Sequence, residues 1–424
     1  MMYQLFGNCL IGQSGGPTSA INASLCGVVE QALKSKCIQN AYGAINGIEG
    51  ILKRQIFDIG SQLKSKDDLE LLKTTPAAYL GSCRYKLPAI HQDTETYKKI
   101  FDIFSQYDIR YFFYIGGNDS MDTVAKLSQY AKKIAYPIYI IGIPKTIDND
   151  LVGTDHTPGF GSAAKFVATT TLEITRDSCV YDVDSVTIIE IMGRNSGWLT
   201  AATALARNEY NSSPDLIYLP EVPFSIDKFI EDIKLVKKHK KNVVVAISEG
   251  IKNVFGEYIC ETVNQGFTDA FGHKYLGGTA KILENAVRNR LRCKVRSIEL
   301  NILQRCAIHM ASKTDLEEAY KIGQQAVKSA ENGYTGKMMI LKREPGPEYK
   351  VSIDSIDIHK IANVEKKVPV EWINEQGNDI TSELIDYIKP LIIGNVELKL
   401  RDGLPVYLVL DTTPFAPKKQ EKVV

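Results

Sequence analysis

Short apolar runs recur along the chain, and each of them ends in Gly, Pro, Asp, Glu or Arg. Runs of this length, apolar at successive positions, are typical of strands that are buried on both faces of a parallel sheet. They cover residues 8–12, 111–117, 138–144, 186–193, 216–221, 242–250 and 297–305. We therefore expect a strand in each of these places.

The stretches between these runs have a different period. In them apolar residues return every three or four positions, which is the spacing of one face of a helix. The clearest are residues 20–34, 94–107, 121–133, 161–175 and 279–291. Strands that alternate with helices predict an α/β protein of doubly wound type, with mainly parallel sheets covered by helices on both faces.

Two regions break this alternation. Residues 343–370 contain Pro345, Gly346 and Pro347 among short apolar stretches, which indicates an irregular segment or an insertion. Near the C-terminus, residues 406–410 have the pattern of one more strand, and the polar residues that follow, 417–424, are expected to fray.

The length and the charge balance limit the possibilities. With 424 residues the chain suits two domains, and the glycine-containing turn at residues 157–161 is a natural place to divide them. The 51 Lys and Arg residues are balanced by 50 Asp and Glu residues, so no net charge draws the protein to nucleic acid or to an anionic membrane. Any anion-binding site must therefore be local.

The cysteine and histidine residues show no metal-binding pattern. The eight cysteines form no C-x-x-C pair and no zinc spacing, and the six histidines are scattered along the chain. The sequence has no run of 18 apolar residues, and its N-terminus lacks a basic region followed by a long apolar one. We expect a soluble cytoplasmic protein with reduced thiols.

The polar residues that follow two of the apolar runs carry the clearest chemistry. One run leads into Gly116-Gly-Asn-Asp-Ser120 and the next into Lys145-Thr-Ile-Asp-Asn-Asp150. Both turns would lie past the carboxyl ends of parallel strands, where such sheets bind ligands. Glycines let backbone N–H groups approach an anion, a lysine can contact phosphate oxygens, and carboxylates can bind Mg²⁺ or accept a proton. Together the two turns indicate phosphoryl transfer.

A third turn, Gln13-Ser-Gly-Gly-Pro-Thr-Ser-Ala-Ile-Asn22, lies between the first strand and a helix, where helical N–H groups and the helix dipole favour a phosphate. It has neither a G-x-G-x-x-G nor a P-loop pattern, so by itself it is equally compatible with a structural turn. Taken with the other two turns, it makes Gly15 a candidate phosphate contact.

In this order, the three turns and the motifs Gly81-Ser-Cys-Arg84 and Gly193-Arg194 make the chain resemble the phosphofructokinase family from Gly12 to about Ala326, and especially its pyrophosphate-dependent branch. The resemblance implies reversible transfer of a phosphoryl group from pyrophosphate to the 1-hydroxyl of fructose 6-phosphate, with Mg²⁺. It assigns donor binding to residues 1–160, rejoined by about 307–390. Sugar-phosphate binding falls to residues 161–306, rejoined by about 391–424.

The resemblance also implies roles near the reacting phosphoryl group. Arg84 would contact it, since a guanidinium can bind phosphate through two parallel hydrogen bonds. Asp148 would take the proton of the sugar hydroxyl, and Asp150 and Asn118 would hold the metal. Many pyrophosphate-using relatives have Asp in place of Asn118. A neutral amide binds Mg²⁺ more weakly, so Asp119 or Asp150 is expected to carry more of the metal binding.

Two positions favour pyrophosphate over ATP. ATP-using relatives have Gly where this chain has Asp119, and Gly again where it has Lys145. A carboxylate at position 119 would crowd and repel the inner phosphate of a nucleotide. The ammonium of Lys145 would fill the space of the absent nucleotide and neutralise the leaving phosphate. We therefore expect Asp119, Lys145 and Asp148 to be the catalytic group.

For the sugar phosphate, the matching family positions are Thr146, Asp148, Met192, Gly193, Arg194, Glu249 and Arg305, and we expect each to lie at a strand end. Two departures stand beside them. Ser185 occupies the place of an arginine that bacterial ATP-using enzymes supply across a subunit contact, and Ile302 occupies a place that usually carries His or Tyr. Because family sites of this kind are completed by a neighbouring subunit, we expect a homodimer or a larger homo-oligomer.

Other functions remain open at this point. The same enzyme could use ATP, although positions 119 and 145 are unfavourable for it. A regulatory member of the family that binds sugar phosphate without catalysis would be expected to lose the base, and Asp148 is intact. A nicotinamide oxidoreductase, which the strand–helix alternation alone would allow, lacks the dinucleotide glycine spacing.

Overall fold

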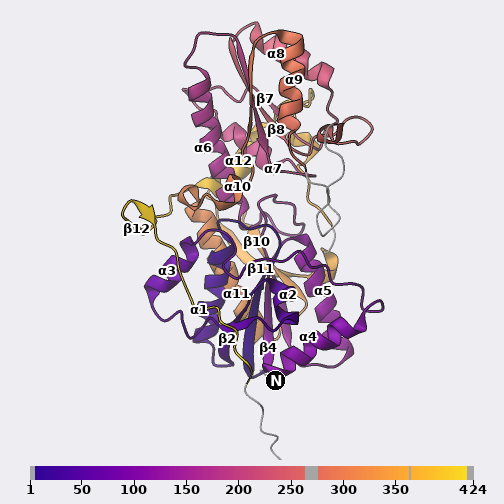
Figure 1. Ribbon diagram of the computed structural model, residues 1–424, viewed down its shortest axis with the longest axis vertical. Coiled ribbons are helices and arrows are strands. Elements are labelled where there is room, and N and C mark those ends of the chain that lie inside the picture. Colours follow the sequence, from indigo (N-terminus) through magenta and orange to yellow (C-terminus); the bar gives the residue numbers. More distant parts are fainter. Residues whose placement is uncertain (1–4, 263–275, 362–363, 418–424) are drawn as a thin grey trace, which may run out of the picture.

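The computed structural model describes residues 5–262, 276–361 and 364–417. Its strands form two large sheets and a small hairpin (Figure 1). The first sheet has seven strands in the order β11-β10-β5-β4-β1-β2-β3. They are β1 (Gly7–Gln13), β2 (Ile38–Ala44), β3 (Ile56–Asp58), β4 (Ile109–Gly116), β5 (Tyr139–Pro144), β10 (Lys337–Arg343) and β11 (Val351–Asp357).

The topology of the first sheet defines where a ligand can bind. Strands β2, β1, β4, β5 and β10 are parallel, while β3 and β11 run antiparallel at the two edges. From β1 the chain passes to β2 on one side, and from the adjacent β4 it passes to β5 on the other side. Connections that leave neighbouring strands in opposite directions open a crevice at the carboxyl ends of those strands.

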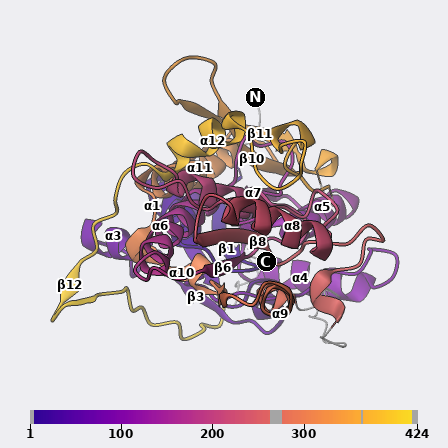
Figure 2. The same ribbon diagram turned by 90° about the horizontal axis from the view of Figure 1, so that it is seen from above.

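The helices of the described residues cover the faces of the sheets (Figures 1 and 2). They are α1 (Ile21–Lys34), α2 (Gly47–Leu52), α3 (Lys66–Thr74), α4 (Thr94–Gln106), α5 (Asn118–Lys133), α6 (Phe160–Ser178), α7 (Trp198–Ala201), α8 (Ile226–Lys237), α9 (Thr279–Leu291), α10 (Leu303–Cys306), α11 (Lys313–Glu331) and α12 (Ser382–Ile388). Within the described ranges, none of them combines the length and the apolar character needed to cross a membrane.

Alternation along β4 builds a core on each side of the first sheet. Phe112 and Tyr114 pack into a cluster with apolar residues of α4 and α5, whereas Tyr111, Phe113 and Ile115 pack into a second cluster with residues of α1 and α11. Because both faces are covered, every position of this run must be apolar, which explains its sequence.

Helices α1 and α11 approach each other closely on one face of this sheet. A Cβ atom on Gly27 would lie 2.0 Å from the carbonyl oxygen of Tyr320, and one on Gly323 would lie 2.2 Å from that of Ser24. The two glycines therefore permit a helix contact that no larger residue could make.

The second sheet has four parallel strands in the order β7-β8-β6-β9. They are β6 (Ser185–Ile191), β7 (Leu216–Tyr218), β8 (Asn242–Ser248) and β9 (Lys294–Glu299). One face packs on residues of α6 and α12, and the other on residues of α8 and α9. In Figure 1 this sheet lies above the first one.

The structure confirms the predicted fold class and most of the predicted elements. Strands lie in all seven predicted places, and helices lie in all five. Two strands end three or more residues earlier than expected. Strand β7 ends at Tyr218, and β9 ends at Glu299, so Arg305 lies on the short helix α10 rather than at a strand end.

The expectation of an irregular segment at residues 343–370 is wrong in part. Strand β11 lies there and pairs antiparallel with β10 along all seven residues of each strand. As an edge strand it is only partly buried, so its sequence alternates instead of forming a continuous apolar run. An alternating edge strand gives a weaker signal than a central one.

The C-terminal part of the chain also differs from the expectation. Residues 406–410 form no strand, and Leu408 packs into the core of the first sheet instead of joining the second half. The backbone N–H of Leu408 donates to Thr75 Oγ1 at 3.0 Å, and that of Leu410 donates to Tyr79 Oη at 2.7 Å. Conversely, Leu384 and Ile388 of α12 pack into the core of the second sheet, although they were expected with the first.

Candidate active site

A cleft of about 710 Å³ lies between the carboxyl ends of the two sheets. The residues predicted for the site come together there, with one exception. The predicted residues that line it are Gly15, Arg84, Asn118, Asp119, Lys145, Thr146, Asp148, Asp150, Met192, Arg194, Glu249 and Arg305. The exception is Gly193, which does not line the cleft but whose N–H donates to the lining residue Glu249.

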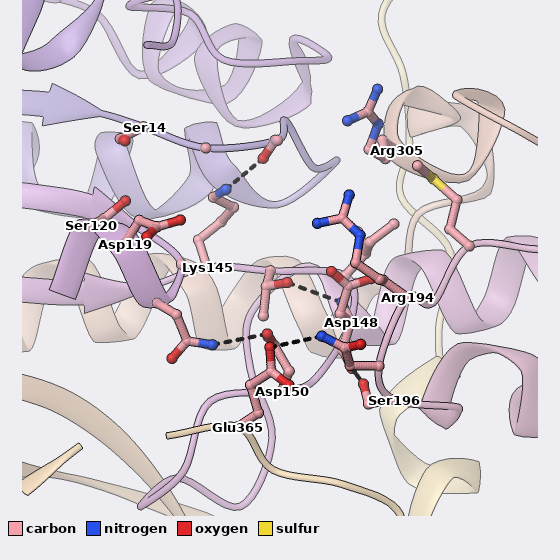
Figure 3. Close-up of a pocket in the computed structure, with 18 of the residues that line it drawn as sticks. Ser14, Asp119, Ser120, Lys145, Asp148, Asp150, Arg194, Ser196, Arg305 and Glu365 are labelled. Carbon is pink, nitrogen blue, oxygen red and sulfur yellow. Dashed lines mark hydrogen bonds between the residues drawn. The ribbon is translucent and has the colours of Figure 1, made fainter. Parts of the chain in front are cut away.

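Lys145 forms the floor of the cleft on the side of the first sheet. It follows β5, its side chain is only 2% exposed, and its Nζ donates to the carbonyl oxygen of Gly16 at 2.5 Å (Figure 3). A Cβ atom on Gly15, where φ is +77°, would lie 3.4 Å from the same Nζ. Burial lowers the pKa of Lys145 to about 8, although the nearby Asp148 opposes this. The result is a fixed ammonium group beneath the glycine turn.

The turn between β4 and α5 forms the adjacent wall. A Cβ atom on Gly116 would lie 2.0 Å from Ser120 Oγ, so the turn can close only around glycine. Helix α5 begins at Asn118, and Asp119 lies in its first turn, where a carboxylate is favoured by the helix dipole. Lys86 Nζ lies 4.0 Å from Asp119 Oδ1.

The turn that carries Asp148 is fixed by hydrogen bonds on both sides. Its backbone N–H donates to Thr146 Oγ1 at 3.0 Å, and its carbonyl oxygen accepts from Ser196 Oγ at 3.0 Å. The next residue, Asn149, is fully buried with φ of +52°. Asn149 Nδ2 donates to Tyr387 Oη at 2.9 Å. These contacts hold the Asp148 carboxyl group at the cleft.

The electrostatic surroundings of Asp148 suit a proton acceptor. Burial raises its pKa above the ordinary value, while the positive charges of Arg194, Lys145 and Arg305 oppose the rise. Burial and the charge of Asp148 together raise the pKa of Asp150 to about 7. A carboxylate with a raised pKa is a stronger base than an exposed one.

Asn118 and Asp150 form a pair that offers oxygen ligands. Asn118 Nδ2 donates to Asp150 Oδ2 at 2.9 Å, while Oδ1 of each side chain is buried and has no hydrogen-bond partner in the part of the chain that the structure describes. The same described residues contain no group of three or more His, Cys, Asp or Glu side chains that could hold a metal alone. A hard cation at this pair would therefore need oxygens from a bound phosphate as well.

On the side of the second sheet, two turns interlock. Ser248 Oγ donates to the carbonyl oxygen of Gly193, and the N–H of Gly193 donates to Glu249 Oε1 at 3.3 Å. A Cβ atom on Gly250 would lie 1.9 Å from the carbonyl oxygen of Arg194. Residues after β6 and after β8 thus position Arg194 and Glu249 together. Burial is the main cause that raises the pKa of Glu249 to about 7.

Arg305 reaches across the cleft from α10. A Cβ atom on Gly16 would lie 3.1 Å from Arg305 Nη1, which places the guanidinium beside the first glycine turn. The neighbouring Ile302 is 56% exposed. Ser185 lies at the opposite end of β6 from Met192, and its Oγ donates to Asn242 Oδ1 at 2.6 Å. Neither Ser185 nor Ile302 lines the cleft, but Ile302 directly precedes the short helix that carries Arg305.

Sequence reasoning missed several residues that line the cleft. They are Ser14, Gly16, Pro17, Lys86, Gly117, Ser120, Ile147, Asn195, Ser196, Val364, Glu365 and Lys367. Most are neighbours of residues that were predicted, and their proximity in sequence could have revealed them. Glu365 and Lys367 had no such signal, because they belong to the segment interpreted as irregular. The N–H of Lys366 donates to the carbonyl oxygen of Asp150 at 2.7 Å, which brings this segment to the site.

Two α/β sheets that present cationic and acidic side chains to one shared cleft suit phosphoryl transfer. The family model described as Phosphofructokinase matches residues 8–330 of the chain. The chain therefore belongs to the phosphofructokinase family.

Relatives within the family extend over the whole chain. The pyrophosphate–fructose 6-phosphate 1-phosphotransferase of Xanthomonas campestris is 40% identical over 415 residues, which cover 97% of this chain and 98% of the relative. The enzyme of the same name from Halomonas elongata is 39% identical over 401 residues, 94% of each chain. The solved structure of a pyrophosphate-dependent phosphofructokinase from Marinobacter aquaeolei has a TM-score of 0.86 at 38% identity and covers 97% of each chain.

Proposed function

We propose that this protein is a pyrophosphate-dependent 6-phosphofructokinase, which transfers a phosphoryl group from pyrophosphate to the 1-hydroxyl of fructose 6-phosphate. The observation that carries the proposal is the buried ammonium of Lys145, bound to the Gly16 carbonyl on the donor side of the cleft. A fixed positive charge there suits a compact polyanion and occupies volume that a nucleotide would need. The names of the relatives from Xanthomonas campestris and Halomonas elongata agree with this choice.

In the proposed reaction, Asp148 takes the proton of the 1-hydroxyl as that oxygen attacks the terminal phosphorus of pyrophosphate. The bond from this phosphorus to the bridging oxygen breaks, and orthophosphate leaves. Arg84, Arg194 and Lys145, which line the same cleft as Asp148, would balance charge on the transferring and leaving phosphates. Catalysis of this kind depends mainly on positioning and electrostatic stabilisation. Orthophosphate is a competent nucleophile for the reverse reaction, so the enzyme should work in both directions.

Phosphoryl transfer of this class requires a divalent cation, and we propose Mg²⁺. The buried Oδ1 atoms of Asn118 and Asp150, which lack hydrogen-bond partners among the described residues, fit a hard cation that also binds donor oxygens. The cation would neutralise charge on the donor phosphates when bound. Asp119 lies nearby, at the start of α5, where its carboxylate would repel the inner phosphate of a nucleotide.

For the sugar phosphate, we assign the hydroxyl groups to Glu249 and the 6-phosphate to Arg194 and Arg305, with Thr146 and the 192–193 backbone supporting the bound sugar. In this arrangement the first sheet binds the donor and the second sheet binds the acceptor. We assign residues 368–392 to the acceptor half, because Leu384 and Ile388 pack against the second sheet. We assign residues 406–410 to the donor half, because Leu408 packs against the first sheet. The division expected from the sequence had these two segments the other way round.

We further propose that the protein is a cytoplasmic homo-oligomer, because family sites of this kind are completed by a neighbouring subunit and symmetric assembly is common for soluble enzymes. One chain has a mass of 47.2 kDa. Light scattering at the enzyme concentrations used for assay should therefore give at least twice this mass. A fully active particle with the mass of a single chain would contradict the proposal.

The decisive experiment compares donors. The purified protein is given fructose 6-phosphate and Mg²⁺ with either pyrophosphate or ATP as the only donor, and fructose 1,6-bisphosphate is measured. We expect kcat/KM for pyrophosphate to exceed that for ATP by at least about tenfold, a difference of 1.4 kcal/mol in transition-state binding. Preference for ATP would overturn the donor assignment but leave the family unchanged, and absence of turnover with both would favour a regulatory role.

A further inference from the structure

The oxygen pair at the proposed cation site is short of negative charge. Asn118 is neutral, so the pair of Asn118 and Asp150 carries at most one negative charge. The affinity of an oxygen site for a divalent cation depends strongly on the charge of its ligands. A further carboxylate near this pair would make up the difference.

Glu365 is such a carboxylate. It lines the same cleft as Asn118 and Asp150, and its backbone forms an antiparallel bridge with Leu151, the residue that follows Asp150. Figure 3 shows both carboxylates in the same part of the cleft. Glu365 comes from a segment more than two hundred residues further along the chain, so only the folded structure brings it there.

The structure holds Glu365 in place through its backbone and its side chain. Leu151 and Glu365 form an antiparallel β-bridge, and the carbonyl oxygen of Lys366 accepts from Trp198 Nε1 at 3.2 Å. Asn195 Nδ2 donates to Glu365 Oε1 at 3.2 Å. These contacts attach the segment to both sides of the cleft and orient the carboxylate, although the side chain stays accessible to solvent from the cleft.

We propose that Glu365 supplies the charge that Asn118 lacks, and that Glu365, Asp150 and Asn118 together hold the divalent cation that accompanies the phosphoryl donor. The inference rests on the proposed function for the identity of the donor, but not for the position of the cation. It explains how a neutral residue can stand at position 118 without loss of the metal site. It also gives the segment at 364–367 a role in the reaction.

The test measures cation binding without turnover. Mn²⁺ is titrated into the full-length protein saturated with imidodiphosphate, a non-hydrolysable pyrophosphate analogue, and free Mn²⁺ is read by electron paramagnetic resonance. Glu365→Gln keeps the size of the side chain and its ability to accept from Asn195 but removes the charge. We expect it to weaken Mn²⁺ binding by at least about tenfold, the scale found when partners of a metal site are changed.

A matched control and a rescue make the test specific. Glu371→Gln removes the same charge from an exposed residue outside the cleft and should leave Mn²⁺ affinity unchanged. Asn118→Asp in the Glu365→Gln background returns the charge to the site and should restore binding to within about threefold of the wild type. Circular dichroism and thermal unfolding establish that each variant is folded.

Two outcomes would overturn the inference. One is a Glu365→Gln protein that binds Mn²⁺ within about twofold of the wild type. The other is a double variant that binds no better than Glu365→Gln alone, which would mean that a charge at position 118 cannot replace that of Glu365 and that the two residues do not serve one cation site. If the wild type prefers ATP in the donor assay, the proposed function fails separately, and adenylyl imidodiphosphate replaces imidodiphosphate in the same titration.

Discussion

The two sides of the cleft are built differently. On the side of the first sheet, Lys145 is buried and bound to a backbone carbonyl, the turn at Gly116 leaves no room for a larger residue, and Gly15 has a φ of +77° that favours glycine. On the side of the second sheet, Arg305 projects from a short helix next to the exposed Ile302. The donor side is thus largely preformed within one chain. The acceptor side is preformed only in part, because interlocking turns hold Arg194 and Glu249 while Arg305 lies next to an exposed residue.

This difference has a physical consequence for specificity. A preformed charge such as Lys145 discriminates between donors because it cannot move away from a ligand that fits poorly. An open site discriminates less until a ligand, or a second subunit, orders it. We therefore expect substitutions on the donor side to change which donor is used, and substitutions on the acceptor side to change mainly the affinity for sugar phosphate.

The largest effect should come from the residue between the two sides. Asp148→Ala should lower kcat by at least about 10²-fold, the scale of a positioned base, with a much smaller effect on KM for either substrate. Asp148→Asn should behave similarly, since it keeps the shape and loses the proton acceptor. Steady-state kinetics with saturating pyrophosphate measure this. Turnover close to that of the wild type would show that Asp148 is not the base and would direct attention to Asp150.

The next largest effect should come from substitutions on the donor side of the cleft. Lys145→Gly should lower kcat/KM for pyrophosphate by at least about tenfold, because it removes the fixed ammonium. Asp119→Gly should instead raise kcat/KM for ATP by relieving repulsion, and the double variant should shift the preference furthest.

The comparison measures kcat/KM for pyrophosphate and for ATP in four proteins, which are the wild type, Lys145→Gly, Asp119→Gly and the double variant. Lys145→Met serves as a control for volume, because it fills the buried space without charge and should lose pyrophosphate activity like Lys145→Gly. A donor ratio that stays within about twofold of the wild type in Asp119→Gly would refute the argument for that residue, even though the family assignment would stand.

A smaller effect should appear in the pH profile. The pKa of Lys145 is lowered to about 8 by burial, so its charge is present below that pH and is lost above it. The value of kcat/KM for pyrophosphate should therefore fall as the pH rises through about 8. Arginine stays protonated over this range, so in an active Lys145→Arg variant the alkaline fall should move upward by more than one pH unit. An identical pH profile in the wild type and the Lys145→Arg variant would show that Lys145 does not cause the alkaline fall in kcat/KM.

The smallest effect should come from the support of the Asp148 turn. Tyr387 Oη accepts from Asn149 and donates to the carbonyl oxygen of Asp155 at 2.6 Å, so Tyr387→Phe leaves a buried amide with one partner fewer. We expect urea unfolding to show a loss of about 1–3 kcal/mol and kcat to fall several-fold. Tyr210→Phe, at an 83% exposed residue, is the control. Equal stability of the two variants would show that this hydrogen bond does not stabilise the turn.

The sequence by itself determined the fold class and the polar residues near the reaction. Buried parallel strands must be apolar throughout, so apolar runs in the sequence predicted β1, β4, β5, β6 and β8. The turns that follow these strands contain the candidate site residues Gly15, Asn118, Lys145, Arg194 and Glu249. A turn directly after a central strand has its position fixed by that strand, and local sequence is then enough. Resemblance to a known family supplied the roles.

The tertiary structure decided what approaches these turns from far along the chain. Edge strand β11 has only a weak alternating pattern in its sequence. The packing of Leu408 and the position of Glu365 beside Asp150 depend on contacts between residues that are two hundred positions or more apart. The buried state of Lys145 is of the same kind, because its partner Gly16 lies 129 residues earlier. Local sequence indicates which residues can bind a charge, but only the packing of distant segments sets which charges face one another, since electrostatic interactions depend on separation in space and on burial.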